Sequence, residues 1–567
     1  MDQRWIIKST PDNRKVEQLS KEINVNPVLS SILIQRGIDT YKKAKSYFRP
    51  SLSGLHDPFL MEDMDLAIER LNRAIHNGEN ILIYGDYDVD GTTSVALVFS
   101  YLKKIYSNVL YYIPDRYQEG YGISKNGIEW ANKNNINLII SLDCGIKAIE
   151  MTKLANKKGI DLIICDHHLP GATLPEAYAI LDPKRKECKY PYKDLSGCGV
   201  GFKFMQGFAK YNKLDDAELF EYLDFLAVSI ASDIVPVNGE NRIFSYFGLE
   251  KLNSNPRPGL KALIDVAGLR GKVTISGIVF GIGPRINAAG RMTHAGLAVE
   301  LLISDSYKKA EHTALEINSN NNERRSFDSN ITQEALKMIE NDTKLKNAKS
   351  TVLFKSDWHK GVIGIVASRC IDKYYRPTII LTKSKNKATG SARSVDGFDV
   401  YEAIAQCSDL LDQYGGHMYA AGLTMDIDKI ASFQKRFEKI VEEKITDEQL
   451  IPHLDIDQII SVEIVTPKFL EILKQMAPFG PANLQPLFIS ENLFVTNRPR
   501  ILKEDHLKFY VHQEGSDTVI ETIGFGLAQY FELINSGMRF KMAYAIEENN
   551  YLNQNSIQFI AKDIKFD

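Results

Sequence analysis

Short apolar runs alternate with longer stretches that repeat apolar side chains at helical spacing. Residues 64–78 show this helical spacing and end at Gly78, which predicts a helix. Further helical stretches follow at residues 92–106, 124–135 and 148–159. Between them, apolar runs predict buried strands at residues 81–84, 108–114, 137–142 and 161–165. This alternation predicts an α/β fold with a parallel sheet that helices cover on both faces.

The pattern changes twice further along the chain. Residues 305–346 are polar and contain no Pro or Gly, which predicts a long helix that bridges two domains. A second α/β pattern follows it, and from about residue 453 short strands have the spacing of a small β-barrel or sandwich. With roughly 150 residues per domain, a chain of 567 residues has room for three or four domains.

Composition and charge exclude several classes of protein. Hydrophobic residues make up 44% of the chain and charged residues 25%, as in ordinary globular proteins. No apolar run approaches the roughly 20 residues of a membrane-spanning helix, and the N-terminus lacks the apolar segment of a secretory signal, so we expect no membrane contact. The six cysteines form no C-x-x-C pair, which argues against a disulfide framework or a zinc knuckle. The net charge of −3 argues against coating of nucleic acid by bulk charge, although a local basic groove is compatible with it.

Side chains that bind metals follow several of the apolar runs. Asp86, Asp88 and Asp90 come directly after the run at 81–84. Four more such residues follow later runs: Asp143, His167, His168 and Asp233. Unpaired carboxylates repel one another, so this crowding requires a cation or a catalytic role to offset it. Because ligands of open α/β sheets bind beyond the carboxyl ends of the strands, we expect these side chains to meet at one edge of the sheet.

Each of these residues taken alone has an ordinary structural interpretation. Asp143 by itself is more often a helix N-cap, Asp233 is open to the same interpretation, and two adjacent histidines can form a solvated loop pair. Their joint occurrence at one sheet edge favours a site of oxygen and nitrogen ligands for manganese or magnesium. With so many carboxylates we expect two ions, because one divalent ion does not offset the charge.

These motifs resemble the DHH phosphoesterase family. "GDYDVDG" (85–91), "SLDCG" (141–145), "DHH" (166–168) and "ASDIVP" (231–236) occur here in that family's order. Further stretches resemble the branch of the family that degrades single-stranded DNA, at residues 280–292, 390–394, 415–422 and 477–488. The resemblance extends from about residue 60 to the end of the chain.

The resemblance implies a fold and a domain order. It implies an α/β protein in which a parallel-sheet DHH domain is joined by a long helix to a smaller α/β DHH-associated domain, with an OB-type β domain at the C-terminus. The expected boundaries are an N-terminal segment at 1–60, the DHH domain at 61–304, the connecting helix at 305–346, the DHH-associated domain at 347–450 and the OB-type domain at 453–567.

The resemblance also implies the metal ligands. These are Asp88, Asp90, Asp143, His167 and Asp233. Asp86 is expected to be a ligand or to lie beside one. His168 is expected to orient the substrate phosphate or a ligand. These two residues and the five ligands form the expected catalytic set. Asp143, from the central junction, is the natural bridging carboxylate. Many members of the family have a histidine where this chain has Tyr84, and a neutral phenol is a poor ligand at pH 7, so we expect weaker binding of the second ion.

The reaction that the resemblance implies is hydrolysis of single-stranded DNA from its 5′ end to 5′-mononucleotides. Arginine suits a terminal phosphate because its planar fork matches the phosphate oxygens. A 5′-phosphate pocket is implied at Arg116, Ser391 and Arg393. The glycines and small residues around His417 allow this side chain and the backbone to approach a phosphate. Contacts to the backbone or bases of the strand near the active site are expected at Arg285, Asn287 and Arg291. The glycine and serines around Arg393 favour a phosphate-binding loop. The alternatives are a surface salt bridge for Arg116 and a tight packed turn at 415–422.

The C-terminal block carries more Asp and Glu than Lys and Arg, so a partner protein is an alternative to DNA as its ligand. The expected partners are single-stranded DNA, a single-strand-binding protein and a repair helicase. We expect a monomer that acts in repair and recombination, in the cytoplasm at the nucleoid. Two other functions stay open: a phosphodiesterase for short oligonucleotides or cyclic dinucleotides, and a non-catalytic scaffold that binds single strands.

Overall fold

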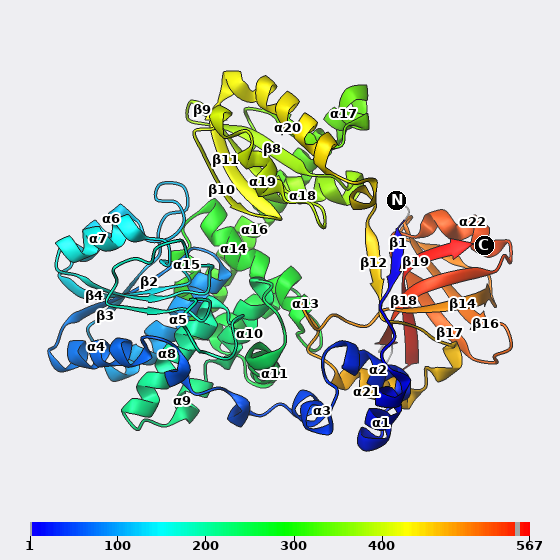
Figure 1. Ribbon diagram of the computed structural model, residues 1–567, viewed down its shortest axis with the longest axis horizontal. Coiled ribbons are helices and arrows are strands. Elements are labelled where there is room, and N and C mark those ends of the chain that lie inside the picture. The colour runs from blue at the N-terminus through cyan, green and yellow to red at the C-terminus, as the bar shows by residue number, and fades with distance from the viewer. Residues whose placement is uncertain (1–2, 550–555, 567) are drawn as a thin grey trace. The chain divides into compact units, whose positions relative to one another are not determined.

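The computed structural model describes residues 3–549 and 556–566, and the chain divides into two units. The smaller unit contains the residues up to Lys8 together with Asn322–Ile456. The larger unit contains Ser9–Asn321 together with the chain from Asp457 onward. Figure 1 labels the helices and strands of both units.

The first sheet of the larger unit is a five-stranded parallel sheet (Figure 1). Its strand order is β3-β2-β4-β5-β6, and all neighbouring pairs are parallel. The strands are β2 (Asn80–Gly85), β3 (Val109–Tyr112), β4 (Ile136–Leu142), β5 (Asp161–Cys165) and β6 (Ala179–Leu181). Because helices cover both faces, these strands read as continuous apolar runs in the sequence. The predicted parallel sheet is confirmed, with β6 as an additional edge strand.

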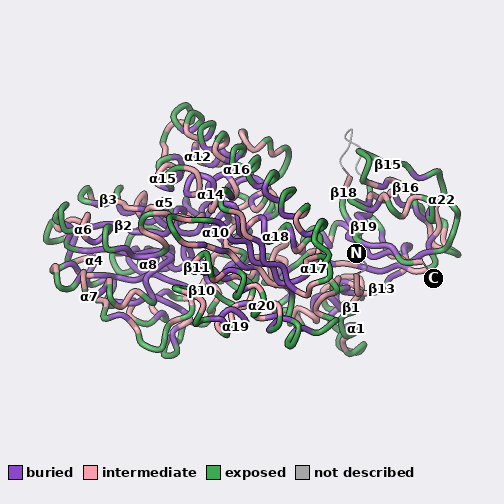
Figure 2. The backbone as a smooth tube through the Cα atoms, turned by 90° about the horizontal axis from the view of Figure 1, so that it is seen from above, coloured by how far each residue is buried: buried purple, intermediate pink, exposed green. Residues whose placement is uncertain are grey.

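Alternate residues of β2 point to the two faces of this sheet. Ile81 and Ile83 belong to a hydrophobic cluster with residues of α5 and α8, while Leu82 and Tyr84 belong to one with residues of α6 and α7. The covering helices are α4 (Met64–His76), α5 (Val89–Ile105), α6 (Lys125–Lys133), α7 (Ile149–Lys157) and α8 (Gly197–Tyr211). Figure 2 shows the largely buried course of β2, and β4 is buried along most of its length as well.

A run of helices follows in the same unit. They are α9 (Asp216–Phe220), α10 (Leu223–Ser232), α11 (Gly239–Ser254), α12 (Pro258–Val266), α13 (Ile275–Gly277), the π-helix η3 (Ile278–Ile282), α14 (Gly283–Met292) and α15 (Gly296–Leu302). The apolar run before Asp233 was expected to reach the sheet edge as a strand does, but it forms the buried helix α10. Periodicity does not distinguish a short buried strand from a buried helix, because both are apolar all round.

A β-barrel forms the C-terminal part of the larger unit. Its strand order is β13-β14-β18-β19-β17-β16-β15, and a further pairing of β14 with β16 closes the barrel. The elements are β13 (Gln458–Ile459), α21 (Pro467–Gln475), β14 (Phe488–Val495), β15 (Arg500–Leu502), β16 (His506–Gln513), β17 (Val519–Gly524), α22 (Phe531–Asn535), β18 (Phe540–Asn549) and β19 (Ser556–Phe566). The predicted OB-type β domain is confirmed.

The N-terminal helices pack on that barrel. They are α1 (Asn13–Ile23), α2 (Pro27–Gln35) and α3 (Tyr41–Phe48). Leu29 shares a hydrophobic cluster with Phe488 of the barrel. Arg242 of α11 donates hydrogen bonds to the carbonyl oxygens of Tyr47 at 3.1 Å and Ala477 at 2.9 Å. It therefore connects α11 to the N-terminal helix α3 and to the segment that follows α21. The N-terminal segment is therefore part of the barrel's core, which no local pattern in the sequence indicates.

The smaller unit contains a second five-stranded sheet, in the order β10-β11-β9-β8-β7. Its strands are β7 (Thr351–Phe354), β8 (Thr378–Ser384), β9 (Lys387–Arg393), β10 (Gln413–His417) and β11 (Ala420–Asp426). Helix α18 (Ile363–Tyr374) packs on one face, while α19 (Val400–Ala405) and α20 (Ile430–Lys444) pack on the other. A separate parallel pair joins β1 (Arg4–Ile7) to β12 (His453–Ile456).

Helix α16 (Tyr307–Asn341) runs from the larger unit into the smaller one and confirms the predicted long helix. The expected single helix over 305–346 is nevertheless two helices. Asp342 accepts a hydrogen bond from Lys344 N at 2.8 Å and so caps α17 (Thr343–Asn347). Aspartate is among the residues preferred at a helix N-cap. Because the second helix starts at this cap, α16 ends before it although the sequence has no Pro or Gly there.

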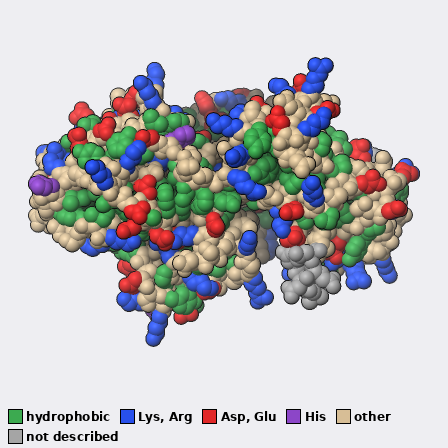
Figure 3. Space-filling model, turned by 90° about the horizontal axis from the view of Figure 1, so that it is seen from below, with side chains coloured by type: hydrophobic (Ala, Val, Ile, Leu, Met, Phe, Trp, Pro, Cys, Tyr) green, Lys and Arg blue, Asp and Glu red, His purple; other side chains and the backbone are tan. Residues whose placement is uncertain are grey.

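Charged side chains of both signs mix on the surface. On the face drawn in Figure 3, Lys and Arg are interspersed with Asp and Glu, in keeping with a net charge of −3. Among the helices of the described residues, none combines the length and the apolar character needed to cross a membrane.

Candidate metal centre and substrate contacts

Three carboxylates lie where β2 ends and α5 begins. Asp88 is the N-cap of α5, and its side chain accepts a hydrogen bond from Gly91 N at 3.0 Å. Asp86 precedes this cap, and Asp90 lies in the first turn of the helix. The unpaired N–H groups and the dipole of a helix N-terminus favour negative charge, so this junction is a suitable place for crowded carboxylates.

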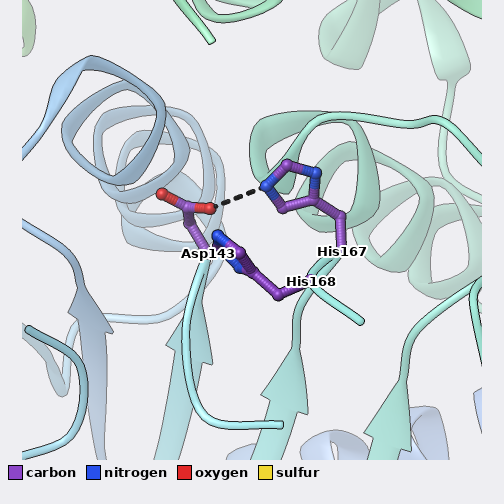
Figure 4. A group of neighbouring side chains, drawn as sticks. All are labelled: Asp143, His167 and His168. Carbon is purple, nitrogen blue, oxygen red and sulfur yellow. Dashed lines mark ion pairs between the residues drawn. The ribbon is translucent and has the colours of Figure 1, made fainter. Parts of the chain in front are cut away.

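Asp143 and the two histidines follow the neighbouring strands β4 and β5. Asp143 has a φ of 59°, in the left-handed region, which aspartate adopts more readily than most residues. Gly197 packs against it, because a Cβ on Gly197 would lie 2.6 Å from Asp143 Cβ. Figure 4 shows Asp143, His167 and His168 grouped together at the ends of these strands.

His167 contacts carboxylates from three other segments. Its Nε2 atom lies 3.1 Å from Asp143 Oδ1 (Figure 4), 3.5 Å from Asp233 Oδ2 and 3.7 Å from Asp90 Oδ2. Asp233 comes from the C-terminus of helix α10 and not from a strand. Residues that are widely separated in the sequence thus meet around one imidazole.

All seven predicted catalytic residues fall into three overlapping groups among the described residues. Within each group the ligand atoms lie within 4.8 Å of one another. The groups are Asp86, Asp88 and Asp143; Asp90, His167 and Asp233; and Asp143, His167 and His168. Asp143 belongs to two groups, so it lies between two positions that suit a cation.

Burial and mutual repulsion perturb the titration of this cluster. Burial, and then the charge of neighbouring carboxylates, raises the pKa of Asp86 and of Asp143 well above the usual value. The same two causes raise the pKa of Asp233 to about 8. Burial lowers the pKa of His167 to about 4, which leaves the neutral imidazole that binds metals. A divalent cation removes the repulsion that causes the carboxyl shifts.

Helix α8 and helix α10 hold Asp90 in place. Gly197 N and Cys198 N, at the start of α8, donate hydrogen bonds to Asp90 Oδ2 at 2.6 Å and Oδ1 at 2.8 Å. Ser229 Oγ of α10 donates a further bond to Oδ1 at 2.7 Å. Because Oδ1 accepts two hydrogen bonds and Oδ2 one, Oδ2 is the atom with a lone pair left for a cation. Sequence reasoning missed Gly197 and Ser229, and only the position of Gly197 just after a helix-capping serine gave any signal.

Asp166 and Tyr121 surround His168, and sequence reasoning missed both roles. Asp166 Oδ1 lies 2.7 Å from His168 Nδ1, and Asp166 also accepts a hydrogen bond from Ile146 N at 2.9 Å. Burial opposes the charge of both groups, but their ion pair raises the pKa of His168 to about 9 and lowers that of Asp166 to about 2. The Tyr121 hydroxyl lies 3.2 Å from His168 Nε2 and 3.1 Å from the carbonyl oxygen of Asp143.

The donor atoms of this cluster fit manganese or magnesium. Asp86 Oδ2 is buried and has no hydrogen-bond partner among the residues that the structure describes, and Asp143 Oδ1 and His167 Nε2, which face one another at 3.1 Å, make no hydrogen bond there either. Buried polar atoms rarely lack a partner, so atoms of this kind point to a bound ion. Carboxylate oxygens with one imidazole nitrogen suit hard divalent cations, not the softer metals that thiolates select.

Tyr84 lies outside the metal centre. Its ring stacks on Tyr112 with centroids 5.4 Å apart, and its hydroxyl donates to Gly122 O at 3.0 Å and accepts from Ser124 N at 3.1 Å. The expectation that Tyr84 weakens the second ion therefore has no support in the structure. Asp86, which directly follows the same strand, contributes a carboxylate to the group that it forms with Asp88 and Asp143.

A cleft of about 240 Å³ opens beside the carboxylates. Three predicted substrate contacts line it together with the acidic residues: Arg116, Asn287 and Arg291. The Arg116 guanidinium lies over the Tyr87 ring, 4.6 Å from its centroid, which fixes it at the edge of the cleft. Guanidinium groups that line a cleft together with carboxylates able to hold cations would suit a phosphodiester bound there.

Arg285 differs from its neighbours Asn287 and Arg291 on α14. Its side chain is buried and donates hydrogen bonds to Gly281 O at 2.7 Å and to Asn318 Oδ1 at 2.9 Å. These bonds hold the start of α14 to α16. The structure contradicts the predicted contact of Arg285 with substrate and gives this residue a structural role.

The remaining predicted contacts, Ser391, Arg393 and His417, share one face of the sheet in the smaller unit. Arg393 of β9 is paired with Ala420 of β11, which is paired with His417 of β10. Ser391 lies two residues before Arg393, and therefore on the same face. The expected phosphate-binding loop at 390–394 is wrong, because these residues up to Arg393 form the strand β9, which is paired on both sides.

Helix α18 packs closely against this face. A Cβ on Gly364, in the first turn of α18, would lie 2.8 Å from Arg393 Nη2 and 2.9 Å from Ser391 Oγ. Arg393 Nη1 donates a hydrogen bond to Ser391 Oγ at 3.0 Å. The glycine thus allows the guanidinium and the hydroxyl to lie directly against the helix.

Three parts of the chain match known domain families. Residues 80–230 match the DHH family, N-terminal domain; residues 347–443 match the DHHA1 domain; and residues 456–563 match the RecJ OB domain. These ranges lie inside the corresponding predicted domains, whose exact boundaries stay predictions.

Full-length relatives and solved structures agree with these matches. The chain is 36% identical to the single-stranded-DNA-specific exonuclease RecJ of Bacillus subtilis, over 99% of this chain and 70% of that protein. It is 31% identical to the RecJ of Escherichia coli, over 95% of this chain and 96% of that protein. The crystal structure of RecJ from Thermus thermophilus in complex with Mn²⁺ has a TM-score of 0.85 and 25% identity, over 99% of this chain and 79% of that one. This chain therefore belongs to the RecJ family.

Proposed function

We propose that this chain is a metal-dependent exonuclease that hydrolyses single-stranded DNA from the 5′ end to 5′-mononucleotides. The observation that carries the proposal is a cluster of carboxylates and histidines, four carboxylates of which line one cleft together with Arg116 and Arg291. The relatives named above are described as single-stranded-DNA-specific exonucleases, and solved RecJ structures hold Mn²⁺ or Mg²⁺.

The cluster has room for two ions. Asp86, Asp88 and Asp143 would hold one, and Asp90, His167 and Asp233 the other, with Asp143 shared between them. Bound here, the ions supply positive charge to the scissile phosphate and lower the pKa of a water molecule so that it attacks at neutral pH.

The chain's own side chains bind and orient the strand. Arg116 and Arg291 bind phosphate oxygens from the side of the cleft, and Asn287 contacts the sugar–phosphate chain next to them. His168, held by Asp166, donates a hydrogen bond to the phosphate and fixes its orientation. Because the acidic groups alone repel a phosphate, these donors and the cations are both required for substrate to enter.

Recognition of the 5′ end is assigned to Ser391, Arg393 and His417. Their common sheet face presents a guanidinium, a hydroxyl and an imidazole, which together match a terminal phosphate. Since a terminal phosphate carries more negative charge than an internal one, a cationic site of this kind favours strand ends.

Two alternative functions are less well supported. A phosphodiesterase for short oligonucleotides or cyclic dinucleotides does not need the barrel, which matches the RecJ OB domain. A non-catalytic scaffold does not need a complete ligand set, and all seven candidate residues are present. The acidic composition of the barrel favours a partner protein over DNA as its ligand, and the proposed partners are a single-strand-binding protein and a repair helicase. The proposed form of the protein is a monomer that acts in repair at the nucleoid.

Digestion of strands labelled at either end tests the proposal. With Mn²⁺ or Mg²⁺, we expect 5′-mononucleotides from a 5′-labelled single strand as the first products, little digestion of duplex DNA and no digestion with EDTA. Release of label first from the 3′ end, or faster cleavage of a dinucleotide than of a long strand, would contradict it.

A further inference from the structure

Three exposed large apolar side chains belong to segments that lead to or from the metal centre. Phe280 is 78% exposed, Leu169 69% and Ile234 65%, the highest values for large apolar side chains in residues 3–549 and 556–566. Leu169 directly follows His168, and Ile234 directly follows Asp233. Single exposed apolar residues are ordinary, but the most exposed ones among the described residues are not expected to fall in segments next to one site.

Ile234 is unfavourable in two ways at once. Its φ is 59°, in the left-handed region, where a β-branched residue is a true outlier. Such strain costs on the order of 1–3 kcal/mol and persists mainly at functional sites. The exposed side chain also gains nothing from burial, so neither packing nor backbone preference explains an isoleucine here.

Phe280 lies in the π-helix η3, which leads directly into the substrate-binding helix α14. Gly283 at the start of α14 lies against the residue before Asp233, since a Cβ on Gly283 would be 2.9 Å from Ser232 Oγ. This close approach brings the end of η3 to the segment that carries Asp233 and Ile234. π-helical turns are rare and occur often at functional sites.

We propose that Leu169, Ile234 and Phe280 form an apolar rim that contacts the bases of the nucleotides next to the scissile phosphate. The proposal deepens the function proposed above and rests on it. A phosphate held at the cleft by Arg116 and Arg291 leaves the attached bases outside its polar lining. The segments next to that lining carry the three apolar residues: Leu169 follows His168, Ile234 follows Asp233, and Phe280 lies in the turn that leads into α14.

This rim gives a reason for the choice of single strands. In a single strand the base faces are free to lie on apolar and aromatic side chains, and this contact does not depend on sequence. In a duplex the same faces are stacked and paired, so the rim offers nothing to them. The charged groups of the cleft recognise phosphates in both forms and do not make this distinction.

Ile234→Gly and Phe280→Ala test the rim, with Leu66→Ala on the remote helix α4 as an exposed apolar control. The substrates are a 5′-phosphorylated single strand and the same strand without bases on its first few nucleotides. We expect each rim variant to lower kcat/KM about tenfold on the complete strand, as for loss of one base contact, and to have little effect on the baseless strand. Ile234→Gly should also raise the melting temperature, because glycine adopts this φ without strain.

The binding of the same strands to the wild-type chain with Mn²⁺ separates this proposal from the proposed function, when the first linkages of both strands are non-hydrolysable. Tighter binding of the complete strand than of the baseless one, with the difference lost in the rim variants, supports the rim even if the chain shows no hydrolysis of natural strands. Equal binding of both strands by the wild-type chain overturns the proposal, and so does a rim variant that still binds the complete strand more tightly by the wild-type margin. If one rim variant fails to fold, the other rim variant decides the outcome.

Discussion

The metal centre differs in its burial from the face formed by Ser391, Arg393 and His417, and both are proposed to contact phosphate. At the metal centre Asp86, Asp143 and His167 are almost completely buried. On the sheet face of the smaller unit, Ser391 and Arg393 are half-buried and His417 is exposed. The first region gathers like charges from distant segments, while the second takes its residues from neighbouring strands.

This difference determines what a substitution does in each region. Burial raises the pKa of the carboxyl groups at the metal centre, so the cluster is unfavourable until cations bind and each residue affects both stability and activity. On the sheet face, the guanidinium of Arg393 is in partial contact with water, so its positive charge has little effect on the free energy of unfolding. Substitutions there should change substrate binding and leave stability and metal binding nearly unchanged.

Asp143→Asn should have the largest effect. Asparagine tolerates the φ of 59° at this position, so the backbone is preserved while the shared carboxylate is lost. We expect kcat to fall roughly a thousandfold or more, since several kcal/mol of metal-derived stabilisation are at stake. The melting temperature without metal should not fall, because a buried repelling carboxyl has been removed, and the rise in melting temperature on adding Mn²⁺ should shrink. Substantial residual activity would contradict the shared role of Asp143.

Arg393→Ala should affect only substrate binding. Loss of hydrogen bonds to a charged group is worth about 1.5–3 kcal/mol, so KM for a 5′-phosphorylated strand should rise on the order of tenfold to a hundredfold. A strand with a 5′-hydroxyl should be digested as by the wild-type chain. Arg436→Ala, which removes an exposed arginine paired with Asp409 in the same unit, is the control. A change in Mn²⁺ affinity or in melting temperature in Arg393→Ala would remove the contrast between the two regions.

Ser229→Ala tests whether the metal centre depends on the residues behind its ligands. It removes the hydrogen bond that Ser229 Oγ donates to Asp90 Oδ1. Cys198 N then remains as the single donor to that oxygen, so the carboxylate is held less firmly. Partners of this kind typically change metal affinity by about 10–100-fold, so we expect Mn²⁺ binding measured by calorimetry to weaken by about tenfold. Ser245→Ala, another buried serine in the same unit, is the matched control. Unchanged Mn²⁺ affinity would limit the role of Ser229 to packing.

Sequence patterns predicted the sheet, the barrel and the clustering of the candidate metal ligands for identifiable reasons. Parallel strands buried on both faces must be apolar throughout, and charged residues directly after them are unusual enough to be noticed. The same reasoning failed for the run before Asp233, because a buried helix is also apolar throughout. It failed again for the break at Asp342, because a capping aspartate looks like any other polar residue inside a polar helix.

Contacts between distant segments were beyond the reach of local patterns. Arg285 and Arg291 lie six positions apart on α14, and only the fold buries one and leaves the other in the cleft. Ser229 and Gly197 support Asp90 across more than a hundred residues of sequence. Tyr84 was expected to weaken the second ion because many members of the family have a histidine there, but the alternation of side chains along β2 directs it into the cluster with α6 and α7.

Gly364→Ala should have the smallest effect and tests how the sheet face is held. A methyl group there would lie 2.8 Å from Arg393 Nη2 and 2.9 Å from Ser391 Oγ, so both must shift by a few tenths of an ångström. We expect KM for a 5′-phosphorylated strand to rise by about threefold to tenfold, less than in Arg393→Ala, because the charge remains and only its geometry changes.

A double variant then shows whether Gly364 acts through Arg393. Adding Gly364→Ala to Arg393→Ala should raise KM no further, since the methyl group has no guanidinium left to displace. Gly277→Ala is the control, because a Cβ there would have no neighbour closer than 3.7 Å. An additive effect in the double variant would show that Gly364 acts on substrate by another route, and the sheet face would then extend onto α18.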